Sequence, residues 1–203
     1  MKLYYGTGAC SLSPHIALRE LGLPFELVKV DTRAGKTEAG ADYRAVNPKG
    51  AVPTLELDDG QRLTEGPAIV QYLADRKPAS GLAPPAGTME RYRLQEWLNY
   101  VTSELHKRFG SLFSPRLQPG WKAVVREQLA EQLAFVASSL EGKQYLLSGS
   151  QPTVADFYLW VVLSWGRFVE VDIGRWPALK EYFKRILARP AVQEALRAEG
   201  LSK

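Results

Sequence analysis

The sequence predicts an α/β domain of order β-α-β-α-β-β-α over residues 1–80, followed by an all-α helical-bundle domain over residues 87–203. Strand and helix signals alternate along the first 80 residues, whereas only helical periodicity follows. Residues 78–87, rich in Pro, Gly, Ala and Ser, separate the two patterns and are typical of a linker. The 203-residue chain is 45% hydrophobic and 24% charged, which favours a packed core over disorder.

The first domain begins with a strand, a helix and a second strand. Residues 3–5 are a short β run, and Ser13 and Pro14 suit the N-cap and first position of a helix that reaches residue 21. Residues 25–30 form the next expected strand, so the two strands of this βαβ unit should be parallel. Beyond them we expect a partly helical segment at 36–46, a hairpin of strands 54–57 and 61–63, and a helix at 67–73.

Apolar residues at a spacing of three to four mark the helices of the second domain, first over residues 94–109 and then over 124–140. Residues 153–165 are apolar nearly all round, as expected of a central buried helix. Thr153 and Asp156 fit a capping box with Asp in place of the usual Glu or Gln. Helices at 177–187 and 190–198 complete the predicted bundle.

The composition argues against several classes of function. A single cysteine permits neither an internal disulfide nor a Cys-x-x-Cys couple, and it fits a reducing compartment. Two histidines and one cysteine are too few for a zinc site, and no nucleotide-binding glycine motif is present. The net charge of +4 arises beyond residue 80 among interspersed acids, so no basic stripe for nucleic acid forms. We find no signal-peptide pattern or membrane-length apolar run, and therefore expect a cytoplasmic protein without a membrane partner.

Cys10 is the candidate for chemistry in the first domain. It follows the first predicted strand and comes just before the first predicted helix. The N–H groups and partial positive charge at a helix N-terminus stabilise a thiolate, so we expect a thiol pKa below its usual value of about 8.5. The hydroxyls of Ser11 and Ser13 are expected to be nearby donors. A small, buried and inert cysteine is the alternative interpretation.

Two further turns of the first domain are candidates for ligand binding. Pro53 begins a predicted strand, which favours either a cis Val52–Pro53 bond or an ordinary trans proline. In a cis turn, the N–H and C=O of Val52 can pair with an extended peptide. Glu65 and Gly66 begin the last helix of the domain, where free N–H groups suit a carboxylate and the Glu65 side chain suits an ammonium group. An acidic first helical turn without a ligand explains this second motif equally well.

The first helix of the second domain carries a polar face. At 100° per residue, Asn99, Ser103 and His106 fall within an arc of about 60°, roughly 130° from the centre of the apolar residues. Lys107 lies next to them. This face is either solvated or the second wall of a ligand site.

Together these motifs resemble the bacterial beta class of the glutathione transferases along essentially the whole chain. The motifs that carry the resemblance are Tyr5-x-x-Gly8-Ala9-Cys10-Ser11-Leu12-Ser13-Pro14-His15, Asn47-Pro48-Lys49-Gly50-x-Val52-Pro53, Thr64-Glu65-Gly66-x-Ala68-Ile69, Glu96-Trp97-Leu98-Asn99-Tyr100, Glu104-Leu105-His106-Lys107 and Thr153-Val154-Ala155-Asp156.

The resemblance implies a thioredoxin-like first domain, a homodimer, and conjugation of reduced glutathione to hydrophobic electrophiles. It implies no metal and no cofactor apart from glutathione as cosubstrate. It assigns Cys10, His106 and Lys107 to catalysis. The glutathione-binding residues that it implies are Cys10, Ser11, Lys36, Val52, Pro53, Glu65, Gly66, Asn99, Ser103 and His106, with Asn99 and Ser103 contributed partly by the dimer partner.

Two positions depart from the family pattern or have a secondary role. Gly35 stands where the family has a lysine for the glycyl carboxylate of glutathione, so Lys36 is the expected substitute. Tyr5 occupies the position of a catalytic tyrosine in other classes, but in the beta class it is not the main thiol activator.

Two alternative functions remain open at this point: a glutathione-dependent thiol–disulfide exchange enzyme acting through Cys10, and a non-catalytic protein that binds hydrophobic ligands. The electrophile pocket is expected to use aromatic residues, although each is equally a candidate for the core. These residues are Tyr5, Phe109, Phe113 and Trp165.

Overall fold

A computed structural model describes residues 1–147 and 149–202 of the chain. The chain divides into two compact units. The first comprises Met1–Ser80 with Arg189–Lys203, and the second comprises Gly81–Ala188.

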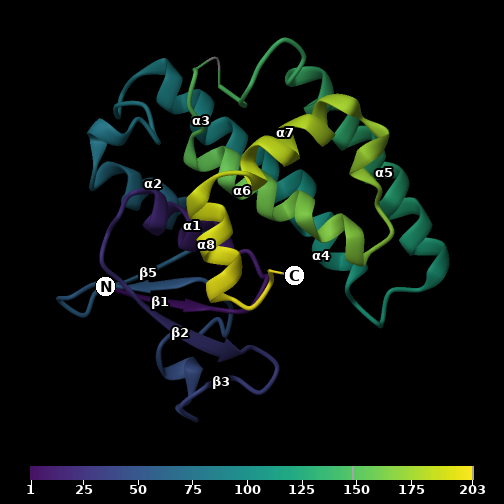
Figure 1. Cartoon of the computed structure of the whole chain (residues 1–203). Helices are drawn as coiled ribbons and strands as arrows, with labels where there is room; N and C mark the ends of the chain where they lie inside the picture. Colours follow the sequence, from purple (N-terminus) through teal and green to yellow (C-terminus); the bar gives the residue numbers. More distant parts are fainter. Residues whose placement is uncertain (148, 203) are drawn as a thin grey trace. The chain divides into compact units, whose positions relative to one another are not determined.

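A five-stranded mixed sheet forms the centre of the first unit, in the order β3-β2-β1-β4-β5 (Figure 1). β1 and β2 are parallel, as the βαβ pattern predicts, whereas the other neighbouring pairs are antiparallel. The predicted hairpin is confirmed as β4 and β5. The strands are β1 (Lys2–Tyr5), β2 (Glu26–Asp31), β3 (Lys36–Thr37), β4 (Thr54–Glu56) and β5 (Arg62–Thr64).

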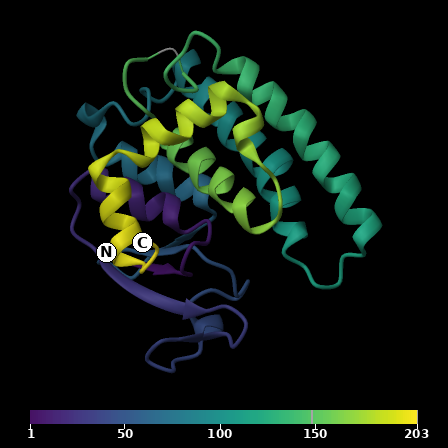
Figure 2. The ribbon, with the colours of Figure 1, turned by 45° about the vertical axis from the view of Figure 1, so that its right-hand side comes forward.

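Three α-helices belong to this unit: α1 (Leu12–Glu20), α2 (Gly66–Asp75) and α8 (Pro190–Ala198). α8 lies alongside α1 in both ribbon views (Figures 1 and 2). The apolar face of α8 is buried there through Ala191, Val192 and Ala195. The sequence prediction placed this helix in the second domain, because its periodicity shows an apolar face without showing which element covers it.

Of two local predictions in the first unit, one is confirmed and the other is wrong. Residues 36–46 are helical in part, as predicted: after β3 and a turn at Gly40 (φ +84°), the three-residue 3₁₀ helix η1 (Tyr43–Ala45) begins where the Asp42 side chain caps the backbone N–H of Arg44. α1 begins at Leu12, so Ser11 rather than Ser13 occupies its N-cap position, and the Ser11 side chain makes no capping hydrogen bond. A second 3₁₀ helix, η2 (Pro78–Ser80), ends the N-terminal segment.

The second unit is all-helical. The capping box of Thr153 and Asp156 is confirmed at the start of α6, whose residues are almost all buried. α5 is the long teal-green helix in Figure 2. The elements are α3 (Met89–Tyr100), the π-helix η3 (Val101–His106), α4 (Lys107–Leu112), α5 (Pro119–Ser139), α6 (Val154–Ser164), the 3₁₀ helices η4 (Trp165–Phe168) and η5 (Ile173–Arg175), and α7 (Pro177–Leu187).

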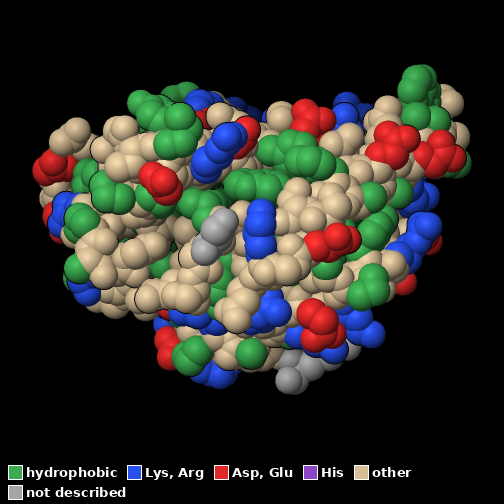
Figure 3. Space-filling view, turned by 90° about the horizontal axis from the view of Figure 1, so that it is seen from above, with side chains coloured by type: hydrophobic (Ala, Val, Ile, Leu, Met, Phe, Trp, Pro, Cys, Tyr) green, Lys and Arg blue, Asp and Glu red, His purple; other side chains and the backbone are tan. Residues whose placement is uncertain are grey.

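One face of the molecule shows the mixed charges that the sequence predicts. On the face drawn in Figure 3, Lys and Arg side chains are interspersed with acidic and hydrophobic ones, without a continuous basic stripe. Within residues 1–147 and 149–202, no helix has the length and apolar character needed to cross a membrane.

Candidate functional site

Cys10 lies in the loop between β1 and α1, and its thiol is half-buried. Its Sγ lies 3.3 Å from the carbonyl oxygen of Val52, which is the geometry of an S–H donor on a carbonyl. A hydrogen bond of this kind stabilises the protonated thiol and opposes the effect of the nearby helix N-terminus. The expected reactivity of Cys10 therefore stays a prediction, whereas its placement beside Val52 is a structural fact.

The neighbouring serines do not act as the sequence suggested. The buried Ser11 hydroxyl accepts from the N–H of Gly6 at 3.1 Å and donates to the carbonyl of Gly6 at 3.2 Å, so it closes the loop before the helix. The Ser13 hydroxyl is buried and has no hydrogen-bond partner within the described residues. No contact joins either hydroxyl to the Cys10 thiol in the described structure, and binding of glutathione by Ser11 remains a prediction.

The Val52–Pro53 peptide bond is cis, so this one of the two alternatives is confirmed. Val52 is half-buried, and its N–H has no partner within residues 1–147 and 149–202. The preceding residue, Ala51, offers its carbonyl to two side chains: the Tyr43 hydroxyl at 2.8 Å and the Asn47 amide at 2.7 Å. Val52 therefore presents its N–H from a loop that the Tyr43 and Asn47 side chains hold in place through the carbonyl of Ala51.

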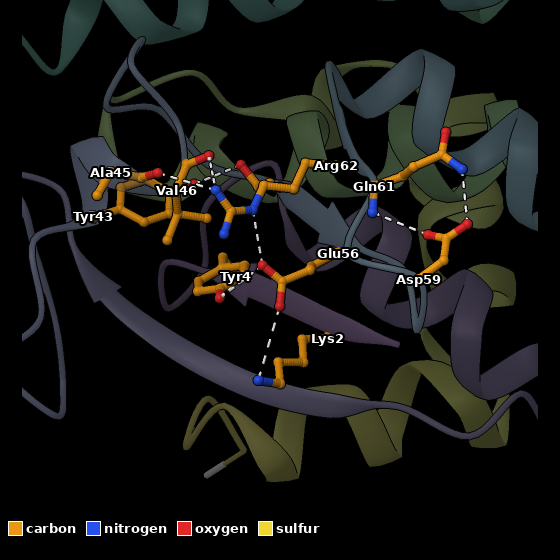
Figure 4. Close-up of polar contacts among 10 residues, drawn as sticks. Lys2, Tyr4, Tyr43, Ala45, Val46, Glu56, Asp59, Gln61 and Arg62 are labelled. Atoms are coloured by element: carbon orange, nitrogen blue, oxygen red, sulfur yellow. Dashed lines mark hydrogen bonds and ion pairs between the residues drawn. The ribbon is translucent and has the colours of Figure 1, made fainter.

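Further hydrogen bonds join this loop to the sheet. The Tyr43 hydroxyl also contacts Thr54 Oγ1 at 2.8 Å, and burial raises the pKa of that phenol. Arg62 of β5 donates to the carbonyls of Ala45 and Val46, next to Tyr43, at 3.0 and 3.3 Å (Figure 4).

The carboxylate of Glu56 contacts three side chains of the same sheet. It accepts from Arg62 Nε at 2.8 Å and from the Tyr4 hydroxyl at 3.4 Å, and it pairs with Lys2 at 3.8 Å (Figure 4). These contacts join β1, β4, β5 and η1, and so they fix the segment that leads to Val52.

Glu65 and Gly66 lie at the start of α2. Glu65 is the N-cap, with a left-handed φ of +67°, and its side chain is 67% exposed. Its carboxylate pairs with the ammonium of Lys49 at 2.6 Å, and the same ammonium donates to Thr64 at 3.1 Å. Lys49 belongs to the Asn47–Pro53 motif, but no signal in the sequence indicated its pairing with Glu65.

The register of β4 and β5 brings these two turns together. Thr54, directly after Pro53, pairs with Thr64, directly before Glu65. A Cβ atom on Gly66 would lie 4.0 Å from Pro53 Cγ. The first unit thus places Cys10, Val52, Pro53, Glu65 and Gly66 in one neighbourhood.

Lys36 is not joined to this neighbourhood by any described contact. It lies on the exposed edge strand β3, where its backbone is in register with that of Asp31 in β2 and forms an isolated β-bridge with the backbone of Asp42.

The remaining predicted residues belong to the second unit. Asn99 lies near the end of α3, Ser103 and His106 lie in the π-helix η3, and Lys107 begins α4. Asn99, Ser103 and Lys107 are exposed, and His106 is half-buried. The arc of 60° predicted for the first three is wrong, because the i→i+5 bonding of a π-helix widens the turn and reduces the rotation per residue.

His106 is held by two aromatic residues that the sequence did not connect with it. Its Nδ1 lies 2.5 Å from the Tyr158 hydroxyl of α6. The Trp165 ring lies edge-on to the imidazole at a centroid distance of 4.9 Å. Within the second unit, these contacts fix both the position and the plane of the imidazole.

The aromatic candidates for an electrophile pocket have different environments. Phe109 is fully buried, which makes it a core residue, and Trp165 is nearly so. Phe113 is 50% exposed. Tyr5 is buried, and burial together with the Glu199 carboxylate raises its pKa, which disfavours a phenolate and agrees with a secondary role.

No group of three or more His, Cys, Asp or Glu side chains in the described part of the chain could hold a metal ion.

Comparison with known proteins gives matches in both halves of the chain. Residues 7–76 match the family model of the glutathione S-transferase N-terminal domain, and residues 104–190 match that of the C-terminal domain. The chain is 47% identical to glutathione S-transferase GstA of Escherichia coli O157:H7, over 99% of this chain and all of that protein.

Solved structures agree with these matches. A sphingomonad glutathione S-transferase complexed with glutathione superposes with a TM-score of 0.95 at 50% identity, over the whole of both chains. A beta-class glutathione S-transferase of Sphingomonas chungbukensis also gives a TM-score of 0.95, at 47% identity over both whole chains. The resemblance inferred from the motifs and the fold class inferred from their order are both confirmed.

Proposed function

This chain belongs to the glutathione S-transferase family, and on that premise we propose that it binds reduced glutathione and conjugates the thiol to small hydrophobic electrophiles. In this reaction the thiol loses its proton to water, and the sulfur electron pair forms a bond to the electrophilic carbon. The leaving group departs with its bonding pair, or, in an addition, the electrons move onto the electrophile. The nucleophile belongs to the cosubstrate, so the protein supplies orientation and stabilisation of the thiolate.

The neighbourhood formed by Cys10, Val52 and Glu65 is the observation that carries the proposal. The unpartnered N–H of Val52 and its carbonyl, 3.3 Å from Cys10 Sγ, suit the backbone of an extended peptide such as glutathione. The exposed carboxylate of Glu65, at the same end of the β4–β5 pair, suits the ammonium of a γ-glutamyl group. Ser11, Pro53 and Gly66 complete the part proposed for the first unit.

For the second unit, the family resemblance supports the same role for Asn99, Ser103, His106 and Lys107, with His106 and Lys107 assisting at the sulfur. Lys36 is proposed for the glycyl carboxylate. We propose a homodimer that works in the cytoplasm with no cofactor besides glutathione. The relatives do not favour the exchange enzyme or the binding protein.

Glutathione titration by calorimetry tests the role of Glu65. Glu65→Ala should weaken binding by about 1.5–3 kcal/mol, the range for a hydrogen bond to a charged group. Glu26→Gln, which neutralises an exposed carboxylate on β2, is the matched control and should bind as the parent does. Equal affinity in Glu65→Ala and the parent would remove Glu65 from the site.

Turnover separates the three functional classes. The proposed enzyme conjugates a chloronitrobenzene-type electrophile, an exchange enzyme reduces a glutathione mixed disulfide instead, and a binding protein retains glutathione without turnover of either. Sedimentation at micromolar concentration tests the dimer, and a monomer there would contradict it.

A further inference from the structure

The Glu65 carboxylate of the first unit is paired with a lysine next to the cis-proline loop. The ammonium of Lys49 lies 2.6 Å from Glu65 Oε1 and 3.1 Å from Thr64 Oγ1. The other oxygen, Oε2, accepts no hydrogen bond within residues 1–147 and 149–202. Because an ionised carboxylate offers about four lone-pair sites, Glu65 has room for a second ammonium beside that of Lys49.

The turn that carries Lys49 is fixed at its backbone. The N–H of Lys49 donates to Asn47 Oδ1 at 3.1 Å, and the N–H of Gly50 donates to the Asn47 carbonyl at 2.8 Å. The Arg44 guanidinium donates to the carbonyl of Pro48 at 3.1 Å. Beyond this anchored turn, the long and flexible side chain of Lys49 is exposed and can rotate to a new partner.

The backbone of Glu65 is fixed as well, in a conformation that is typical of functional positions. Its φ of +67° is uncommon for a residue other than glycine, and such residues concentrate at ligand sites. Its carbonyl accepts the N–H groups of Ala68 and Ile69 at 3.0 Å, which ties it to α2. The side chains of Lys49 and Glu65 are 56% and 67% exposed, and an exposed ion pair contributes little to stability. A change of partner by Lys49 therefore costs little.

We propose that Lys49 is a specificity-determining residue that binds the α-carboxylate of a γ-glutamyl group while Glu65 binds its α-ammonium. This inference rests on the proposed function. The two charges of an amino-acid end are attached to one carbon atom, so a site that recognises both needs opposite protein charges side by side. Lys49 and Glu65, in contact at 2.6 Å, provide that pair. In the complex, four charges alternate in sign around the α-carbon of the ligand.

The same arrangement discriminates against ligands that carry only one of the two charges. An amine without the neighbouring carboxylate meets the like charge of Lys49, and an acid without the amine meets the like charge of Glu65. Like charges placed side by side suppress the wrong ligand, whereas opposite charges attract the right one. The site therefore favours a zwitterionic γ-glutamyl end over an end that is only an amine or only an acid.

Three ligands that differ only at the γ-glutamyl end test the inference by calorimetry on the full-length protein. They are reduced glutathione, γ-aminobutyryl-cysteinylglycine, which lacks the α-carboxylate, and glutaryl-cysteinylglycine, which lacks the α-ammonium. Each ligand is titrated into the parent, Lys49→Met and Glu65→Ala. Arg76→Met is the matched control, because it removes an exposed positive charge directly after α2, at the end of the helix opposite Glu65. It should bind all three ligands as the parent does.

The two variants should affect different ligands. Lys49→Met should weaken the binding of glutathione and of the glutaryl analogue roughly 5- to 20-fold, the effect of one partly exposed hydrogen bond between charged groups. It should leave the γ-aminobutyryl analogue bound equally well or more tightly, because a repulsion is removed. Glu65→Ala should weaken the binding of glutathione and of the γ-aminobutyryl analogue, but not that of the glutaryl analogue.

Unchanged or tighter glutathione binding in a folded Lys49→Met would overturn the inference, because Lys49 would then only compete for Glu65. An equal loss for all three ligands would overturn it too, since Lys49 would then only support the loop. If Lys49→Met does not fold, the parent decides: it should bind glutathione more tightly than either analogue, and equal affinity for glutathione and the γ-aminobutyryl analogue would contradict the role of Lys49. These results leave the proposed function intact, whereas a parent that binds none of the three ligands refutes it together with this inference.

Discussion

The carboxylate of Glu199 is buried directly after α8, and replacing it tests how the C-terminal segment supports the loop that carries Cys10. Its Oε2 accepts the backbone N–H of Gly8 at 2.9 Å, and its Oε1 accepts Nδ1–H of His15 at 2.8 Å. The side chains of Glu199 and His15 are both fully buried. Glu199→Ala therefore leaves an imidazole donor and a backbone donor facing an apolar gap.

The expected loss of stability follows from these two bonds. A hydrogen bond to a charged acceptor contributes about 1.5–3 kcal/mol, and loss of the acceptor leaves the donors unsatisfied. Contacts within one network do not add in full. We therefore expect the free energy of unfolding to fall by about 3–5 kcal/mol in Glu199→Ala, and by about 1–3 kcal/mol in Glu199→Gln, which keeps one acceptor oxygen.

Urea unfolding followed by far-UV circular dichroism measures both losses. Glu194→Ala is the matched control, because Glu194 lies on α8 with its side chain 49% exposed and pairs with Arg19 at 3.6 Å. An exposed pair contributes about 0–1 kcal/mol, so the control should change little. Equal losses in Glu199→Ala and Glu194→Ala would refute the reasoning, because they would show that the buried carboxylate is no more important than the exposed one.

Three more outcomes are expected. Asp156→Ala removes the acceptor of four buried hydrogen bonds, including one from Tyr182. The free energy of unfolding should therefore fall by about 4 kcal/mol or more. A loss below about 1 kcal/mol in a urea titration would contradict this expectation. Cys10→Ala should abolish the mixed disulfide with glutathione, read by mass spectrometry, while conjugation falls only in part; complete loss of conjugation in a folded protein that still binds glutathione would favour the exchange enzyme. The hydrogen bond from Arg108 lowers the pKa of the Glu104 carboxyl below its ordinary value of 4.5. This pair therefore stabilises the fold above about pH 4.5, and the contribution disappears as the pH falls through the lowered pKa. Arg108→Met should raise the Glu104 pKa in an NMR titration, and an unmoved pKa would assign the shift to another group.

Local signals in the sequence predicted much of the fold and part of the candidate site. The strand before Cys10, the helix after it, the β4–β5 hairpin and the capping box of Thr153 and Asp156 all depend on residues within a few positions of each other. The same locality explains the failures. The polar face around Ser103 was drawn on an ideal α-helix that the chain replaces by η3, and Ser13 was assigned the N-cap although α1 begins at Leu12.

The sequence by itself determined the order of the elements, the position of Cys10 at a helix start and the family, because periodicity, caps and motif spacing are properties of neighbouring residues. Only the tertiary structure decided which side chains and backbone groups form hydrogen bonds and ion pairs with one another. Glu199 reaches Gly8 across 191 positions, Tyr158 reaches His106 across 52, and Lys49 reaches Glu65 across 16. Which donor meets which acceptor depends on how sheets and helices pack, and no local pattern records that packing. For this reason the candidate residues were visible in the sequence, whereas the groups that hold them in place were not.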